Sequence, residues 1–448
     1  MYRLTIIILI FFASCNLGKS DYTTFTTDPI RYSKTVKELN NIVLENNFAP
    51  MVASRNYVYA NIAAYECMVA GDSSWQTLSG QILHMPAMPR LPIGTDIDHN
   101  LASLLAFVKV GNAVTFPEGS MMKVYDRLVH EADSMGISGD KLKNTKLFAD
   151  TIAGAVLAWS KGDNYSKTRG ASRYTVEETA GRWVPTPPMY ATAVEPHWME
   201  IRTMVLDSAS SFMCKRPPVY DVKNKNSEFY KALMEVKNIG DSLTDEQKHI
   251  ADFWDDNPFK MNVTGHVMYA TKKFSPPGHW MNIVGIAAQK AGADLHTTIA
   301  AYTKTSIALF DAFIGCWDEK YRSNYVRPET VINQIIDPNW QPYIQTPPFP
   351  TYVSGHSTIS AAAAEVMTEY FDNISFTDTS LKEFGIANRE IRSFSDAAKE
   401  AGMSRIYGGI HFSFDNTEGY TLGKKIGEKV VQRIKLQRTG KAGTPGNK

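Results

Sequence analysis

The sequence has few cysteines, almost no net charge and, beyond its first residues, no apolar run long enough to span a bilayer. Its four cysteines include no Cys-x-x-Cys pair, which argues against a disulfide framework and against a zinc-thiolate site. The 47 basic and 46 acidic residues leave a net charge of +1, whereas nucleic-acid-binding proteins usually carry a strong basic excess. We therefore expect no nucleic-acid partner, and we expect any bound anion to be held by locally gathered cations.

The N-terminus has the layout of an export signal. Arg3 precedes an apolar run over residues 4–13 that is too short to span a membrane. The four residues that end at Cys15 resemble a bacterial lipobox, in which the cysteine is acylated and becomes the mature N-terminus. An ordinary cleaved signal peptide is the alternative. We assign residues 1–20 to a lipoprotein-type signal segment, and we expect an exported bacterial protein. It would be periplasmic or anchored to the outer membrane, with a lipid on Cys15 as its only membrane attachment.

Helical periodicity dominates after residue 30, and strand-like alternation is scarce. Apolar residues recur at three- and four-residue spacing, with prolines gathered between the periodic stretches, which cover about 34–70, 121–160, 226–255, 281–317, 356–371 and 387–405. This pattern predicts an all-α fold of two packed helical bundles, with the active site in the C-terminal bundle. The expected division is an N-terminal helical half at 21–235, a catalytic helical half at 236–437 and a disordered tail at 438–448.

The first of three motifs in the C-terminal half contains two cations. Lys320 and Arg327 are seven residues apart, and Pro328 follows. If this segment is helical, both cations lie on one face, about 10 Å apart. Two converging cations suit an oxyanion, although a Lys/Arg pair on a helix more commonly belongs to a solvated surface.

The second motif is Ser354-Gly355-His356, at the start of a predicted helix. A helix N-terminus offers unpaired backbone N–H groups, and glycine lets the chain approach an anion closely. His356 adds a group that exchanges a proton near neutral pH. Taken singly, the motif is better explained by an N-capping serine beside an incidental histidine.

The third motif places Arg405 and His411 six residues apart across a Gly-Gly pair. Asp415 follows His411 by four residues, a helical spacing that lets its carboxylate hold one ring nitrogen. The other nitrogen would then be free to act as a nucleophile or a ligand. A capping contact at a helix end is the alternative.

In this order, the three motifs resemble the signature of the superfamily of type 2 phosphatidic acid phosphatases and vanadium haloperoxidases. Val353 departs from it, because the family usually has proline there. The resemblance implies a cradle around the equatorial oxygens of phosphate or vanadate, formed by Lys320, Arg327, Ser354, Gly355 and Arg405. It also implies that His411 is the axial group, that His356 is the acid–base residue and that Asp415 orients His411.

Two aromatic residues favour a haloperoxidase over a phosphatase. Trp317, three residues before Lys320, and Phe349, five before Ser354, resemble aromatics that haloperoxidases place at these positions. Such walls would exclude water and hold a weakly hydrated halide, although a place in the hydrophobic core is the alternative for both. The resemblance, nearest to the bacterial haloperoxidases and iodoperoxidases, implies vanadate on His411 and oxidation of iodide or bromide by hydrogen peroxide. An organic acceptor would be a further small-molecule partner.

The expected reaction assigns two further roles and leaves two alternatives open. Lys320 would polarise the peroxide, and His356 would move the proton. In the first alternative, an acid phosphatase uses His411 as nucleophile and His356 as general acid. In the second, the protein binds phosphate without turnover, against which the two intact histidines argue. The sequence leaves the halide preference, the organic substrate and the oligomeric state undetermined.

Two weaker candidates lie upstream of the motifs. Asp255 and Asp256 follow Trp254, and an acidic residue at this place is expected to pair with an arginine of the cradle, as in related enzymes. His279, within Pro-Pro-Gly-His-Trp, is expected in a loop near the mouth of the pocket.

Overall fold

The computed structural model describes residues 21–115, 120–258, 260–264 and 267–437. The predicted signal segment 1–20, with Cys15, and the predicted tail 438–448 lie outside the described residues.

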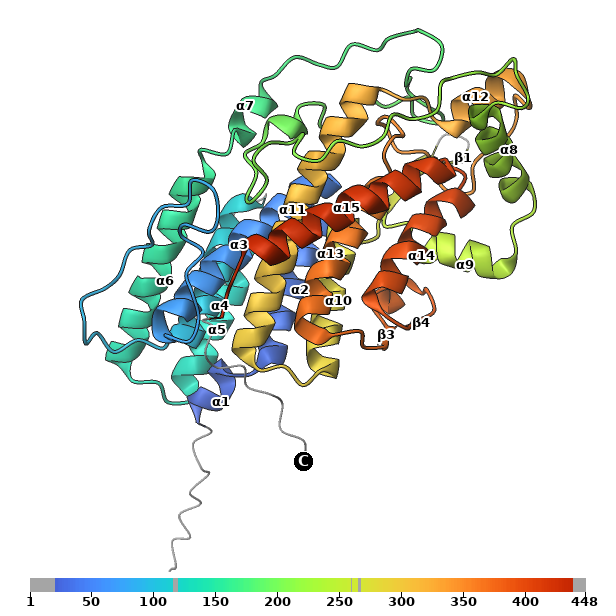
Figure 1. Cartoon of the computed structure of the whole chain (residues 1–448). Coiled ribbons are helices and arrows are strands. Elements are labelled where there is room, and N and C mark those ends of the chain that lie inside the picture. Colours follow the sequence, from blue (N-terminus) through green and yellow to red (C-terminus); the bar gives the residue numbers. More distant parts are fainter. Residues whose placement is uncertain (1–20, 116–119, 259, 265–266, 438–448) are drawn as a thin grey trace, which may run out of the picture.

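Helices account for most of the described chain, which confirms the predicted all-α fold (Figure 1). The first seven are α1 (Tyr22–Thr26), α2 (Pro29–Glu45), α3 (Pro50–Gly71), α4 (His99–Val114), α5 (Met122–Ser134), α6 (Gly139–Ser160) and α7 (Tyr165–Arg169). The others are α8 (Glu228–Asp241), α9 (Asp245–Phe253), α10 (Pro276–Lys290), α11 (Leu295–Ser323), α12 (Pro328–Ile335), α13 (Gly355–Phe371), α14 (Phe394–Tyr407) and α15 (Ser413–Arg433). Two single 3₁₀ turns occur at Trp198–Glu200 and Lys382–Phe384.

Strands are confined, in the described part of the chain, to two antiparallel pairs. In one pair, β1 (Lys260–Thr264) lies beside β2 (Val267–Thr271), with Lys260 opposite Thr271. In the other, β3 (Phe376–Asp378) lies beside β4 (Arg389–Ile391), with Phe376 opposite Ile391. Neither pair forms a layer of the fold.

The predicted helical stretches are in the right places, but several are too long. The stretch 34–70 is two helices, because a new helix begins at Pro50, where proline suits the first turn. The stretch 387–405 begins as β4 and becomes helical only at Phe394. Helix α4 was not predicted because residues 101–108 are buried on every side and show no polar face. Helix α15 was missed because its glycines at 419, 423 and 427 are poor helix formers.

Helix α11 lies at the centre of the molecule. It is buried along almost its whole length, from Leu295 to Lys320, and it packs against α2, α3 and α10 as well as against α13 and α15 (Figure 1). The apolar core is therefore continuous, and it extends from Phe25 to Leu436. The division of the chain between 21–235 and 236–437 stays a prediction, since this core runs across it.

Helices α13 and α15 approach each other closely because glycines line their contact. A Cβ atom added at Gly423 would lie 1.9 Å from the carbonyl oxygen of Thr358, and one added at Gly419 would lie 2.8 Å from that of Ser354. The Ser354 N–H donates to the Asp415 carbonyl oxygen at 3.0 Å. The second and third sequence motifs are thus held together by backbone contacts that only glycine permits.

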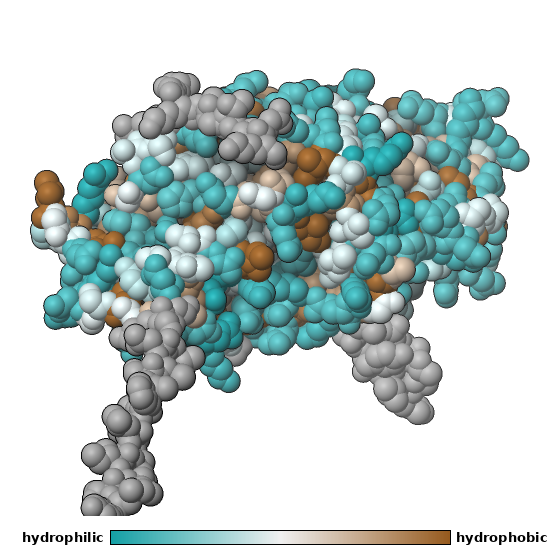
Figure 2. Space-filling view, turned by 90° about the horizontal axis from the view of Figure 1, so that it is seen from below, coloured by the Kyte–Doolittle hydropathy of each residue, from teal (hydrophilic) through white to brown (hydrophobic). Residues whose placement is uncertain are grey.

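Length and hydropathy decide whether a helix of the described chain could span a membrane. Among the described residues, no helix has both the length and the apolar character needed to cross a bilayer. The face shown in Figure 2 is mostly hydrophilic, with small apolar patches scattered over it. Cys67, Cys214 and Cys316 are free thiols.

We expect the Gly423→Ala variant to lose about 3 kcal/mol of unfolding free energy, because the new methyl group would overlap the Thr358 carbonyl and force α13 and α15 apart. Gly154→Ala in α6 is the matched control: its Cβ would meet no atom within 4 Å, and the change should stabilise the helix by roughly 1 kcal/mol. Urea unfolding measures both. Equal stabilities of Gly423→Ala and wild type would contradict the close packing of α13 on α15.

Candidate active site

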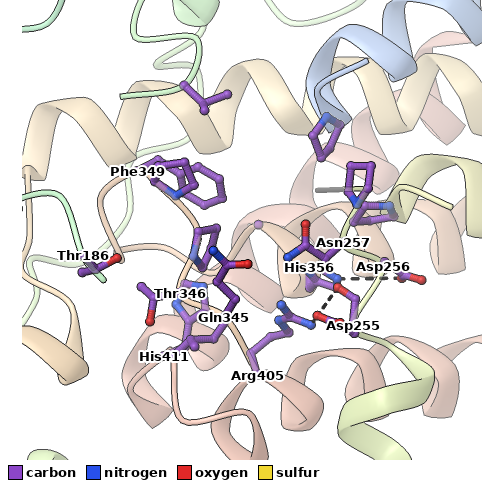
Figure 3. A pocket seen from close by; sticks show the side chains of 18 of the residues that line it. Thr186, Asp255, Asp256, Asn257, Gln345, Thr346, Phe349, His356, Arg405 and His411 are labelled. Atoms are coloured by element: carbon purple, nitrogen blue, oxygen red, sulfur yellow. Dashed lines mark hydrogen bonds and ion pairs between the residues drawn. The ribbon is translucent and has the colours of Figure 1, made fainter. Parts of the chain in front are cut away.

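The three motifs meet at a cavity of about 320 Å³. Gly355, His356, Arg405 and His411 line its inner wall, and Figure 3 shows the two imidazoles and the Arg405 guanidinium converging there. The remaining walls come from elsewhere in the sequence, and they include residues from α3, from the loops at 186–194 and 345–349, and from the turn at 255–258. Lys320, Arg327 and Ser354 are fully buried directly behind the inner wall.

Lys320 and Arg327 converge, but they do not lie on one helix as the spacing argument assumed. Helix α11 ends at Ser323, and Asn324 adopts a left-handed backbone conformation with φ of +48°. Arg327 is the N-cap residue of α12, and Pro328 begins that helix instead of ending one. The two cations therefore meet because the chain turns sharply between them.

Both cations hold the loop that leads into Ser354. The Lys320 Nζ donates to the carbonyl oxygens of Pro350 and Thr351, each at 2.9 Å. The Arg327 Nε donates to the carbonyl oxygen of Phe349 at 2.9 Å. These bonds bring the positive charges against the back of the loop, so they fix its path as well as setting the charge of the site.

The second motif caps a helix and also leaves room for an anion, so both roles considered for it are present. Ser354 caps α13, because its side chain accepts from the Ser357 N–H at 3.4 Å. Gly355 faces the cavity, and a Cβ atom added there would meet only the Trp317 ring, at 3.8 Å. The space in front of the α13 N-terminus is thus open to a ligand, where unpaired N–H groups favour an anion.

His411 is held by a carboxylate on one side and by an arginine on the other. Its Nδ1 lies 2.8 Å from Asp415 Oδ2, and its Nε2 accepts from Arg327 Nη1 at 3.1 Å. The proton must therefore be on Nδ1, which leaves a lone pair on Nε2. His411 precedes α15 and Asp415 belongs to its first turn, so the contact is present although the assumed helical spacing is wrong.

Thr351 completes this arrangement and was missed by the sequence reasoning. Its hydroxyl donates to Asp415 Oδ2 at 2.5 Å and lies 3.1 Å from His411 Nδ1. The Asp415 carboxylate therefore receives hydrogen bonds from both Thr351 and His411. No spacing rule links Thr351 to His411 and Asp415, which lie 60 and 64 residues further along the chain, so no sequence pattern pointed to it.

The electrostatic environment keeps both cavity imidazoles neutral. Burial lowers the pKa of His411 far below its usual 6.5, and the nearby cations, Arg327 first, act in the same direction. Burial and then Arg405 likewise lower the pKa of His356 well below 6.5. Burial also lowers the pKa of the Lys320 ammonium. An anion in the cavity would oppose all of these shifts, because it stabilises positive charge.

Two buried guanidinium donors of the site lack a hydrogen-bond partner within the described residues. They are Arg327 Nη2 and Arg405 Nε. An unpaired buried polar group costs about 1–3 kcal/mol, and a ligand with several acceptor oxygens would satisfy both at once. The donor set, with neutral His411 beside it, therefore fits a tetrahedral oxyanion such as phosphate or vanadate.

The acidic turn before β1 does not form the direct ion pair predicted for it. The Arg405 Nη1 donates to the carbonyl oxygens of Trp254 at 2.7 Å and Asp255 at 3.4 Å, both backbone groups. Asp255 and Asp256 both line the cavity, and they raise the pKa of Arg405 against the larger lowering effect of burial. Asp256 Oδ2 instead lies 3.8 Å from His356 Nε2 (Figure 3).

His279 does not lie in a loop at the pocket mouth. It belongs to the first turn of α10 and is fully buried. Of the residues around it, Pro276 reaches the cavity. The Pro-Pro-Gly sequence suggested a loop. Proline is nevertheless tolerated in the first turn of a helix, because the N–H group that it lacks would have no carbonyl partner within the helix there.

Trp317 and Phe349 form an aromatic wall of the cavity. Their ring centroids lie 5.0 Å apart, and the Lys320 Nζ lies 5.0 Å from the Phe349 centroid. A strap at 186–194, from the N-terminal half, closes this side: the Val194 carbonyl accepts from Trp317 Nε1 at 3.3 Å and from the Tyr321 hydroxyl at 2.7 Å. The proline-rich strap carries no periodicity, so its place over the site could not be predicted.

Fold and site together define an all-helical protein with a buried cationic site for an oxyanion, opening into a largely apolar cavity. Comparisons with known proteins agree with this class. The family model described as the VCPO second helical-bundle domain matches residues 300–440. A search of curated proteins found no match.

Solved structures extend the likeness to almost the whole chain. The first bacterial vanadium-dependent iodoperoxidase is 40% identical, covers 92% of this chain and 98% of its own, and superposes with a TM-score of 0.87. A holo-type bacterial vanadium-dependent chloroperoxidase is 18% identical, covers 87% of this chain and 93% of its own, and has a TM-score of 0.66, which shows a shared fold. The chain belongs to the family of vanadium-dependent haloperoxidases.

Proposed function

We propose that this protein oxidises iodide or bromide with hydrogen peroxide at a vanadate ion bound to His411. The observation that carries the proposal is the neutral imidazole of His411, whose Nε2 lone pair lies among buried cationic donors with unmade hydrogen bonds. Membership of the haloperoxidase family favours the peroxidase reaction over phosphate ester hydrolysis. When bound, vanadate would supply a Lewis-acidic centre that activates hydrogen peroxide toward halide.

The residues that hold the ion act by charge, by hydrogen bonding and by orientation. Lys320, Arg327 and Arg405 neutralise the negative oxygens, while the Ser354 hydroxyl and the Gly355 N–H add uncharged donors. Asp415 keeps the His411 proton on Nδ1, so that the Nε2 lone pair would bind the metal in place of its 3.1 Å contact with Arg327 Nη1. Lys320 also polarises peroxide through its charge, in addition to holding the loop at 350–351.

His356 is the proton carrier in this proposal. Its imidazole is neutral and lies at the cavity wall, and Nε2 lacks a hydrogen-bond partner. This nitrogen can therefore accept a proton from hydrogen peroxide and return it to the product. The imidazolium formed in this way would face the Asp256 carboxylate at 3.8 Å. That carboxylate would stabilise the charged form.

The aromatic wall and the strap explain the choice of a halide as substrate. Trp317 and Phe349 exclude water from the inner cavity, which favours a large and weakly hydrated anion such as iodide or bromide. Further out, Pro187, Met189 and Ala191 give the cavity an apolar opening. An uncharged organic acceptor would enter there.

We expect purified protein loaded with orthovanadate to oxidise iodide in the presence of hydrogen peroxide, and we expect His411→Ala to lower this activity by at least about 1000-fold, because the axial ligand is lost. Triiodide absorbance gives the rate. His296→Ala is the control: His296 is held by Asp72 and Asn100, outside the cavity lining.

A parallel assay with p-nitrophenyl phosphate tests the alternative. Hydrolysis that orthovanadate inhibits, without any iodide oxidation, would overturn the proposal in favour of a phosphatase with His411 as nucleophile and His356 as general acid.

We also propose that the protein is exported and attached to a membrane by a lipid on Cys15. The support is the layout of residues 1–15: one arginine, a short apolar run and then small residues before cysteine. In a bacterial host, full-length protein should sediment with membranes, and Cys15→Ser should become largely soluble. Equal distribution of both proteins between the two fractions would contradict the anchor.

A further inference from the structure

A fully buried histidine bridges two buried carboxylates directly behind the acid–base residue. His279 Nδ1 lies 2.9 Å from Asp256 Oδ1, and His279 Nε2 lies 2.9 Å from Asp378 Oδ2. The three side chains are at most 2% exposed. Each ring nitrogen meets a carboxylate oxygen, so with both carboxylates ionised both nitrogens carry hydrogen and His279 is an imidazolium. A buried ionic triad of this kind is costly unless its members are well paired and hydrogen-bonded.

The charge of His279 is maintained by its neighbours. Burial by itself would lower the pKa of His279, but Asp256 and Asp378 outweigh this effect and raise the pKa to about 10. The ring also stacks on Trp254, with centroids 4.7 Å apart. The imidazolium is therefore fixed both in charge and in orientation.

Asp256 connects this bridge to the cavity. It uses Oδ1 for His279 and leaves Oδ2 toward His356 Nε2, at 3.8 Å (Figure 3). Its backbone is in the left-handed region, with φ of +44°, a conformation that costs a non-glycine residue roughly 1 kcal/mol. The hydrogen bond from His279 Nδ1 holds the Asp256 side chain in this conformation.

We propose that His279, anchored by Asp378, is a positioning residue that holds the Asp256 carboxylate against His356 during proton transfer. The inference rests on the proposed role of His356 as the acid–base residue. His279 touches neither substrate nor ion. It acts through Asp256, which gives the imidazolium of His356 a fixed counter-charge at the moment when it forms.

The direction of the pH effect follows from the groups around Asp256. Burial raises the pKa of Asp256, and His279 is the largest influence that lowers it, followed by Arg405 and Lys273. Removing the imidazolium therefore raises the pKa of Asp256 further. The carboxylate would then take up a proton at a higher pH, and the counter-charge for His356 would be lost on the acidic side.

Other charged groups face the same two side chains and remain in place in the variant. Those facing His356 are Arg405 on α14, Lys320 on α11 and His411 before α15, and the charge of His279 itself also lowers the pKa of His356, so its removal raises that pKa as well. Those on the side of Asp256 are Arg405, Lys273 and, in the same turn, Asp255. A change confined to His279 thus alters one charge and leaves the rest of the site as it was.

The test compares His279→Gln with wild type. A glutamine keeps one hydrogen bond and removes the charge. We expect kcat to fall about tenfold at pH 7, the KM values for halide and peroxide to stay within about twofold, and the acidic limb of the pH profile to move up by about one unit. Vanadate affinity, measured by equilibrium dialysis, should stay within about twofold, because no vanadate-holding residue has changed.

Two control variants separate positioning from stability. Asp378→Asn keeps an acceptor for His279 and should lower kcat less than His279→Gln does, with its acidic limb moved in the same direction. Asp163→Asn removes another buried carboxylate, whose oxygen lies 2.7 Å from Arg55 Nε. Neither residue of this pair lines the cavity. It should lower the melting temperature without moving the pH profile.

An unchanged pH profile in His279→Gln, or a loss of vanadate affinity as large as the loss of kcat, would overturn the inference. The test stays valid if the proposed function fails. His356 exchanges the proton in both the peroxidase and the phosphatase reaction, so the activity that wild type has serves for the comparison. Absence of iodide oxidation in wild type would count against the proposed function alone.

Discussion

The site depends on one buried imidazole that is held between a carboxylate and an arginine. The Asp415 carboxylate accepts a hydrogen bond from His411 Nδ1, and Arg327 donates to Nε2. The two contacts are compatible in one tautomer, because a hydrogen bond to Nε2 is possible only if the proton lies on Nδ1. The arrangement offers a lone pair in a cationic surrounding, which suits an electrophilic oxyanion and little else.

The fold supplies the rigidity that this arrangement needs. Asp415 is in the first turn of α15 and its carbonyl binds the Ser354 N–H, so the second and third motifs form a single unit. The glycines of α15 allow the helices behind this unit to approach to backbone contact. The carbonyl groups of the loop at 349–351 accept hydrogen bonds from Lys320 and Arg327. Burying these cations without partners would be costly, and the loop carbonyls serve as their partners in the absence of an anion.

The sequence predicted the fold class and the inner wall of the cavity, because three short motifs keep their order and residue types regardless of the connections between them. It failed where a contact depends on tertiary structure. Lys320 and Arg327 meet because the chain turns at Asn324, whose backbone is left-handed. Helical periodicity does not predict such a turn. Thr351 was missed because its partners lie 60 and 64 residues further along the chain. His279 was misread because Pro-Pro-Gly marks helix starts as well as loops.

The central claim is that His411 Nε2 is the attachment point of vanadate, and a crystal structure of the protein grown with orthovanadate tests it most directly. The account predicts vanadium bonded to His411 Nε2, with the vanadate oxygens within hydrogen-bonding distance of Arg327 and Arg405. Vanadium bound elsewhere in the cavity, or a cavity that stays free of it at saturating orthovanadate while Arg327 still contacts His411, would contradict the account.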